Sequence, residues 1–275
     1  MKHNELAQRI TTVILLLIFT CLILAFSNHS GVLTGLTIFL CGFSVYEIYH
    51  AMNFQKDIPL IIISEVFSLI FCFLKIPHYT FFLAIIYPII VLFFFAMMIT
   101  HKKMELYSKM QAIMFLCVIL FFFQSLKELR LVKNGFYYLA YAISISVFTD
   151  TFAFVWGKLL GKHKMAPTIS PHKTWEGSIG GTVTCLLLVI LAAKLVQRYT
   201  QITILYQPMV ITTIAASILS QMGDLFMSVI KRVCGIKDYG SIFPGHGGVL
   251  DRFDSHLFAL PFVLITQTYL VDFII

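Results

Sequence analysis

Apolar runs of about 20 residues recur along almost the whole 275-residue chain, and a helix of this length crosses the hydrocarbon core of a bilayer. In lipid, only helices and closed barrels satisfy the hydrogen bonds of their own backbone. The chain is 59% hydrophobic and 12% charged, whereas a soluble domain has about 25% charged residues. The sequence therefore predicts an all-α, polytopic integral membrane protein and argues against a water-soluble enzyme.

We predict about nine transmembrane helices. The first follows Lys2 and Arg9 and has the look of a signal peptide, but its apolar stretch of 17 residues is long for one, so we expect an uncleaved span. The third and fifth runs are short, and one of them is a candidate for a re-entrant segment. The nine runs cover residues 10–26, 31–50, 58–74, 79–99, 110–126, 136–157, 177–196, 203–223 and 257–275.

The distribution of positive charge predicts the orientation. Of the 20 Lys and Arg residues, 14 fall in the N-terminal tail and the even-numbered loops. The other six are on the opposite side, five in the odd-numbered loops and Lys194 at the end of the seventh run. The positive-inside rule then places the N-terminus and the loops 158–176 and 224–256 in the cytoplasm. With a net charge of +7, basic loops between apolar spans fit anionic lipid or an anionic substrate. We expect no nucleic-acid partner.

The densest polar segment of the chain runs from Ser228 to Asp254. So many charges between membrane spans indicate a ligand. Acids combined with cations and flexible glycines suit a metal ion and phosphate groups, because Mg²⁺ is held by one or two carboxylates plus substrate phosphates. Asp224 together with Asp251 fits that description. The segment holds Lys231, Arg232, Lys237, Arg252, Asp238, Asp251, Asp254 and the turn Gly245-His246-Gly247-Gly248.

A polar stripe precedes this segment at helical spacing. It consists of Ser217, Ser220, Gln221, Asp224, Ser228 and Lys231, which share one face of a helix. A hydrogen-bonded seam between helices explains the serines and the glutamine. It does not explain Asp224 followed by Lys231 and Arg232, so we favour a functional role for this face.

A third polar element lies between residues 146 and 177. Ser146, Asp150, Ala153 and Gly157 line one face of the sixth run; close packing explains the alanine and the glycine but not Asp150. In the basic stretch that follows, Thr174 can cap a helix starting at Trp175, and Lys173 beside such a helix start would favour an anion. The alternative is a solvated basic loop that only sets topology.

The first half of the chain contains no motif, and two acids stand out in it. Glu47 lies near the end of a span, where we expect it at the membrane interface. Glu65 lies in the middle of a span. An intramembrane carboxylate is a functional candidate, and a hydrogen bond inside the helical bundle is an equally good explanation.

The segment 228–254 resembles the signature of phosphatidate cytidylyltransferases, also called CDP-diacylglycerol synthases. Two flanking pieces, Gln221–Leu225 and Ser170–Gly177, also resemble the family, although His172 stands where Lys is usual. The resemblance covers about the last 130 residues. The signature positions are Ser228, Lys231, Arg232, Lys237, Asp238, His246, Gly247, Gly248, Asp251, Arg252 and Asp254.

The resemblance implies that CTP and phosphatidic acid give CDP-diacylglycerol and pyrophosphate without a covalent enzyme intermediate. It implies Mg²⁺ as cofactor, a second cation being left open, with Asp224 and Asp251 as metal ligands. It also implies a homodimer in a bilayer, for which we expect the bacterial inner (plasma) membrane. Residues 1–135 would form N-terminal transmembrane helices without a motif, and 136–275 the C-terminal catalytic region of the same membrane unit.

Phosphoryl-type transfer needs positioning and charge neutralisation, which suggests roles for the remaining residues. The cations can hold the triphosphate or the lipid phosphate, and the sequence does not divide them between the two. His246 can shape the loop or contact phosphate. We assign Asp224, Asp251, Lys231, Arg232, His246 and Arg252 to catalysis, and Lys173, Ser228, Lys237, Asp238, Gly247, Gly248 and Asp254 to substrate binding.

Two other classes of function remain open. An ion or lipid transporter could use Glu65, Asp150 and Asp224, but the richest polar cluster lies in a loop. A related lipid enzyme, such as a CTP-dependent polyprenol kinase or an ether-lipid cytidylyltransferase, would carry a similar motif. CDP-alcohol phosphatidyltransferases are disfavoured because their Asp-Gly-x-x-Ala-Arg pattern is absent from this chain.

The predicted orientation can be tested by cysteine labelling. In a variant whose native cysteines are replaced, Ser241→Cys should react with a membrane-impermeant thiol reagent from the cytoplasmic side only, because the loop 224–256 carries the inward-directing charges. Labelling from the opposite side would overturn both the topology and cytoplasmic access to this loop.

Overall fold

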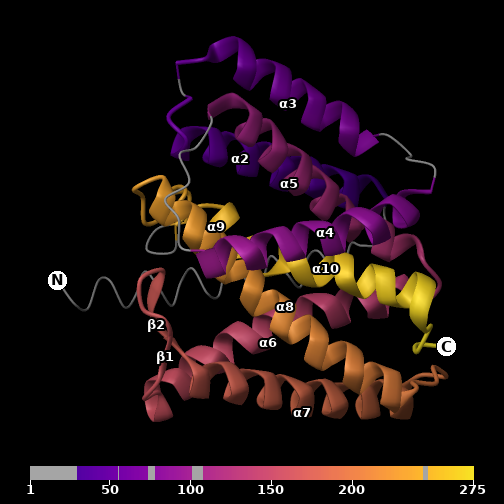
Figure 1. Ribbon diagram of the computed structural model, residues 1–275. Helices are drawn as coiled ribbons and strands as arrows, with labels where there is room; N and C mark the ends of the chain where they lie inside the picture. The colour runs from indigo at the N-terminus through magenta and orange to yellow at the C-terminus, as the bar shows by residue number, and fades with distance from the viewer. Residues whose placement is uncertain (1–29, 55, 74–77, 101–107, 244–246) are drawn as a thin grey trace. The chain divides into compact units, whose positions relative to one another are not determined.

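The computed structural model describes residues 30–54, 56–73, 78–100, 108–243 and 247–275, and these are mostly helical (Figure 1). The helices are α2 (Ser30–Ala51), α3 (Ile58–Phe73), α4 (Tyr79–Thr100), α5 (Ser108–Leu131), α6 (Gly135–Leu160), α7 (Trp175–Tyr199), α8 (Tyr206–Val233), α9 (Leu250–Phe253) and α10 (His256–Ile265), followed by a π-helix over Thr266–Leu270. Among the described residues, β1 (Lys164–Ala166) and β2 (Ser170–Thr174) form a two-stranded hairpin.

The helices confirm the predicted all-α, polytopic membrane architecture. In the described ranges, four segments are long and apolar enough to cross a membrane: 31–51, α6, α7 and α8. The segments 58–73, 79–92 and 256–270 are shorter apolar helices. Each predicted run from the second to the ninth overlaps one of these helices or α5. The first run lies outside the described residues, so the number of nine spans stays a prediction.

Two predicted runs differ from the helices that form. Helix α8 continues to Val233, ten residues beyond the predicted end of the eighth run. The ninth run is helical only as far as Leu270. Beyond it the backbone is extended, because its polar groups find partners outside a helix: Ile275 and Thr203 exchange two hydrogen bonds of 2.9 and 3.0 Å.

The chain divides into two compact units. The first comprises 1–77, 101–127 and 230–253, and the second comprises 78–100, 128–229 and 254–275. In the first unit, α2 packs against α3 and α9. The hydroxyl groups of Tyr49 and Ser64 join α2 to α3 at 2.8 Å. The contact with α9 places the start of that helix against α2.

In the second unit, α6 and α7 approach so closely that their contact requires small residues. A Cβ atom on Gly181 would lie 2.8 Å from the backbone nitrogen of Ala153, and one on Gly177 would lie 2.6 Å from the Ala153 carbonyl oxygen. Gly157 faces the Gly177 Cα. The structure thus confirms close packing as the explanation for Ala153 and Gly157.

A hydrogen-bonded seam joins α6, α7 and α8 in the same unit. Thr149 donates to the Ser217 hydroxyl at 2.9 Å, and the hydroxyl groups of Ser217 and Thr182 lie 2.9 Å apart. The Gln221 amide donates to Thr182 at 3.0 Å. The seam explains Ser217 and Gln221 and leaves Asp224, one turn further along α8, to be explained by the site.

We predict that Gly181→Ala lowers the melting temperature of the detergent-solubilised protein, because overpacking costs about 1–3 kcal/mol. Alanine is the better helix former by about 1 kcal/mol, so a net loss would reflect the collision with α6. Gly35→Ala in α2 is the matched control, since a Cβ there meets no atom within 4 Å. Equal melting temperatures for the two variants would contradict the packing argument.

Candidate functional site

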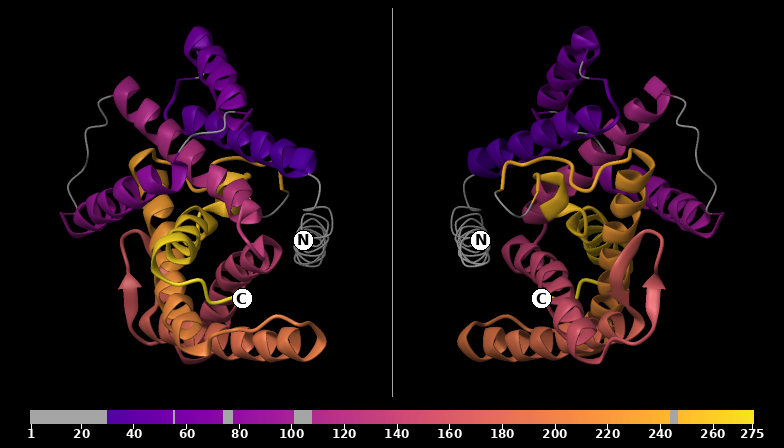
Figure 2. Two further views of the ribbon diagram at one scale, coloured as in Figure 1. Left: turned by 90° about the vertical axis from the view of Figure 1, so that its right-hand side faces the viewer. Right: turned by 90° about the vertical axis from the view of Figure 1, so that its left-hand side faces the viewer.

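The basic stretch before α7 is an ordered hairpin whose base is tied to the helix start. Strands β1 and β2 pair antiparallel, with Lys164 opposite Thr174, and they lie at the N-terminal end of α7 (Figures 1 and 2). Thr174 has the extended backbone of an N-cap, and its hydroxyl accepts the Gly177 N–H at 3.2 Å. The predicted cap and the helix start at Trp175 are therefore confirmed.

Glu176 holds the other end of this stretch. Its carboxylate accepts the backbone N–H groups of Lys162 and His163 at 3.1 and 3.2 Å and lies 2.5 Å from the His163 Nδ1. The Lys162 side chain is exposed. The segment is therefore neither a free loop nor uniformly solvated, because its two ends are pinned to the first turn of α7.

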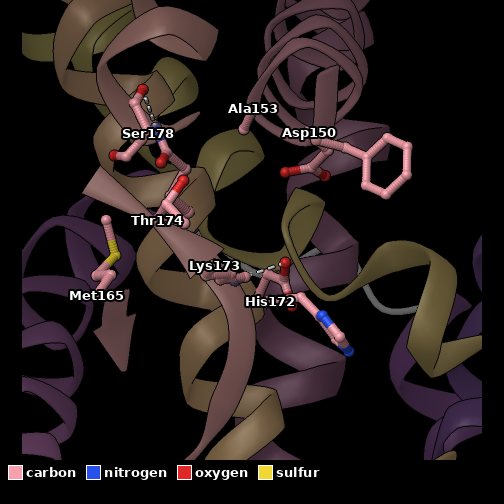
Figure 3. Close-up of a pocket in the computed structure, with 10 residues that line it drawn as sticks. Asp150, Ala153, Met165, His172, Lys173, Thr174 and Ser178 are labelled. Atoms are coloured by element: carbon pink, nitrogen blue, oxygen red, sulfur yellow. Dashed lines mark hydrogen bonds and ion pairs between the residues drawn. The ribbon is translucent and has the colours of Figure 1, made fainter. Parts of the chain in front are cut away.

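A pocket of about 200 Å³ lies in the second unit beside β2 (Figure 3). Lys173 reaches into it from β2, and its Nζ lies 2.6 Å from the Oδ2 of Asp224. About a quarter of each side chain remains exposed. The predicted approach of the basic stretch to Asp224 is thus present. The pocket is lined by Asp150, Ala153, Phe154, Met165, His172, Lys173, Thr174, Ser178, Gln221 and Asp224.

Asp150 connects the pocket to the start of α10. Its Oδ2 accepts the Ser255 hydroxyl at 2.7 Å. Asp254 is buried, and its Oδ1 accepts the backbone N–H of Ser255 at 2.8 Å. Asp150 is therefore a lining residue with a defined partner, whereas Asp254 shapes the turn before α10. The substrate-binding role of Asp254 stays a prediction.

In the first unit, Asp251 is the centre of a buried polar cluster. Its Oδ1 lies 2.8 Å from the Lys231 Nζ. Its Oδ2 accepts the backbone N–H groups of Tyr239 and Gly248 at 2.7 and 2.9 Å. The Lys231 and Asp251 side chains are only 11% and 2% exposed. Three predicted site residues thus meet here, and a buried acid with these donors is held firmly in one orientation.

Glu47 belongs to this cluster, where its carboxylate is buried against backbone groups of the 249–250 segment. That it lies at the depth of the membrane interface stays a prediction. Only 2% of the residue is exposed. Its two carboxylate oxygens accept the backbone N–H groups of Val249 and Leu250, each at 2.8 Å. Sequence reasoning missed this contact because the partners are backbone groups 200 residues away. The one available signal was a lone acid in the apolar second run.

The remaining predicted residues are placed as follows. The Ser228 hydroxyl donates to the Asp224 Oδ1 at a long 3.4 Å. Arg232 donates from Nη1 to the Ile236 carbonyl oxygen at 3.1 Å. Gly247 adopts a φ of 82°, in the left-handed region that favours glycine. Lys237 and Asp238 are exposed, Arg252 is half-buried on α9, and His246 lies outside the described residues.

The two predicted metal ligands belong to different units, Asp224 to the second and Asp251 to the first. No group of three or more His, Cys, Asp or Glu side chains that could hold a metal occurs in the described part of the chain. Mg²⁺ is commonly held by one or two carboxylates and completed by substrate phosphates, so these acids suit a site of that kind. That they share one ion stays a prediction.

Comparison with known proteins yields a family and a set of bacterial relatives. Residues 7–270 match the cytidylyltransferase family. The chain is 47% identical over 128 residues to a phosphatidate cytidylyltransferase of Staphylococcus haemolyticus, covering 46% of this chain and 48% of that protein. It is 44% identical over 136 residues to one of Staphylococcus epidermidis, covering 49% and 51%. For one of Staphylococcus aureus the values are 46% over 127 residues, covering 46% and 47%. The chain spans about half the length of the curated relatives it matches.

Proposed function

This chain belongs to the cytidylyltransferase family, and we propose that it transfers the cytidylyl group of CTP to phosphatidic acid. The products would be CDP-diacylglycerol and pyrophosphate. The observation that carries the proposal is the Asp251 cluster, where Lys231, Gly248 and Asp251 of the motif converge through hydrogen bonds and an ion pair. Relatives named phosphatidate cytidylyltransferase support the choice of lipid substrate.

In the proposed reaction, a phosphate oxygen of phosphatidic acid attacks the α-phosphorus of CTP. The bond from the α-phosphorus to the bridging oxygen of the β-phosphate breaks, and pyrophosphate leaves with that electron pair. A phosphate monoester has a second pKa of about 6, so the attacking oxygen is already ionised and needs no strong base. The protein must then align the two phosphates and neutralise their charge.

The pocket beside β2 has the mixed lining that such a reaction requires. Lys173 supplies a cation at the start of α7, where backbone N–H groups also favour an anion. The apolar side consists of Ala153, Phe154 and Met165. Phe154 is 70% exposed. We infer that a phosphate binds at the Lys173 side, with the less polar part of a substrate against the apolar side.

Each proposed metal ligand is paired with a lysine: Lys173 with Asp224 and Lys231 with Asp251. Unpaired carboxylates would repel a triphosphate, and each lysine neutralises the negative charge of the aspartate with which it pairs. Asp224 and Asp251 would hold Mg²⁺, which neutralises charge on the phosphate oxygens and polarises them when bound. Lys173 and Lys231, displaced from the carboxylates, would then be available to the phosphates.

The site must be accessible to both substrates of the proposed reaction. CTP is soluble in water, whereas the acyl chains of phosphatidic acid stay in the bilayer. We propose that the loops 158–176 and 224–256 face the cytoplasm of a bacterial plasma membrane and that the pocket also admits lipid. The protein would act as a homodimer in that membrane.

The reaction class can be tested with CTP labelled at two positions. Purified protein with phosphatidic acid and Mg²⁺ should move a cytidine label into the lipid fraction and release pyrophosphate, while a γ-phosphate label should stay in the aqueous phase. A γ-label in the lipid would indicate a CTP-dependent kinase. No transfer of either label from an intact, folded preparation would reject the proposal.

Asp224→Asn should abolish turnover without unfolding the protein. The amide keeps the size of the side chain but removes the charge that would attract a metal ion and Lys173. We expect the loss of activity to be accompanied by weaker binding of Mn²⁺ in the presence of nucleotide, measured by electron paramagnetic resonance. Near-normal turnover or unchanged Mn²⁺ affinity would reject the metal role.

Lys173→Ala should raise the KM for one substrate or lower kcat by about tenfold or more, the effect of losing one charge-assisted hydrogen bond. Lys162→Ala is the matched control. Its side chain is exposed, and only its backbone nitrogen contacts Glu176, so its kinetics should stay close to wild type. Small and equal effects of both substitutions would instead support the alternative that the basic stretch before α7 only sets the membrane topology.

A further inference from the structure

We propose that Glu47, on helix α2, is a positioning residue that fixes the glycine-rich segment carrying Gly248 and Asp251. The local anchoring stands on the structure of the first unit. The catalytic consequence rests on the proposed function. Helix α2 packs against α9 within this unit, so the acid reaches the segment from a helix that contains no part of the family motif.

The burial of Glu47 requires a strong reason. The residue is 2% exposed, and a buried carboxylate is costly unless its oxygens are hydrogen-bonded. Each oxygen accepts one backbone N–H at 2.8 Å, from Val249 and from Leu250. Val249 directly precedes α9, and Leu250 is its first residue. The N–H groups at the start of a helix have no partner within the helix. One side chain thus satisfies two otherwise orphaned donors.

The carboxylate also explains two glycines. A Cβ atom on Gly240 would lie 2.6 Å from the Glu47 Oε1. A Cβ atom on Gly248 would overlap the carboxylate itself. These two positions require glycine because Glu47 occupies the space that a side chain would fill. The backbone at Gly240 and at Gly248 can therefore approach the Glu47 carboxylate of α2 closely.

The anchoring reaches the reactive residues through short links. Gly248 donates its N–H to the Asp251 Oδ2 at 2.9 Å, and the Asp251 Oδ1 pairs with Lys231 at 2.8 Å. Leu250, which is bonded to Glu47, directly precedes Asp251. A shift of the 248–250 backbone would therefore change the orientation of the Asp251 carboxylate and, with it, the position of the Lys231 ammonium.

The direct test is Glu47→Gln, examined by hydrogen exchange and by kinetics. An amide keeps the size of the side chain but offers one acceptor, so its NH₂ group would face one of the two backbone donors. We expect amide exchange in a peptide covering 247–253 to accelerate about tenfold or more on losing this bond to a charged acceptor. Loss of the outer-shell partner of a metal ligand costs about 10–100-fold in activity. By analogy, we expect kcat of Glu47→Gln to fall by about tenfold or more, with the KM for CTP changed much less.

Glu65→Gln is the matched control, because Glu65 is a further acid in an apolar helix of the first unit, and a Cβ atom on Gly42 of α2 would lie 3.1 Å from its Oε2. Its exchange at 247–253 and its kcat should match wild type. A second test uses the collision at Gly248. Gly248→Ala should accelerate exchange of the segment strongly in the wild type and much less in a Glu47→Ala background, because the carboxylate that collides is gone.

The outcomes separate the anchoring from the proposed reaction. Unchanged exchange in Glu47→Gln overturns the anchoring, whatever the activity. Accelerated exchange with an unchanged kcat overturns the positioning role. Accelerated exchange in Glu47→Gln, together with a wild-type protein that moves no cytidine label, supports the anchoring and rejects the proposed function.

Discussion

A charge that is buried or half-buried in a chain this apolar must find a partner, and three carboxylates show how the described structure meets this requirement. Asp251 takes a lysine and two backbone N–H groups, and Glu47 takes two backbone N–H groups. Asp224 takes a lysine from the hairpin. Because an unsatisfied buried ion costs several kcal/mol, these pairings also determine where irregular backbone can lie between apolar helices.

The two lysine–aspartate pairs differ in a way that suits different tasks. Lys231 and Asp251 are almost fully buried, and separating a buried pair leaves a charge without compensation. Lys173 and Asp224 are each about a quarter exposed, and a pair that water reaches is weaker and easier to exchange. We infer that an incoming ligand separates the Lys173–Asp224 pair more readily than the Lys231–Asp251 pair, which also helps to hold its segment in place.

Features encoded by neighbours in the sequence were predictable, and features that depend on distant partners were not. The cap at Thr174 follows from a hydroxyl three residues before the Gly177 N–H, and the polar face of α8 follows from helical spacing. The hairpin 164–174 needed the pinning of Lys162 and His163 by Glu176, which no periodicity reveals. Glu47 could not be assigned because its partners are main-chain groups, which every residue but proline carries.

The two compact units alternate along the sequence, and this has a consequence for how the protein can be built. Neither unit is a contiguous piece: the first is completed only by 230–253, and the second contains segments on both sides of that stretch. During synthesis, the two backbone N–H groups that bind the Glu47 carboxylate are added 202 and 203 residues after Glu47 itself. The first unit therefore cannot be completed until most of the chain has been made, and surfaces that stay uncovered in the meantime favour misassembly.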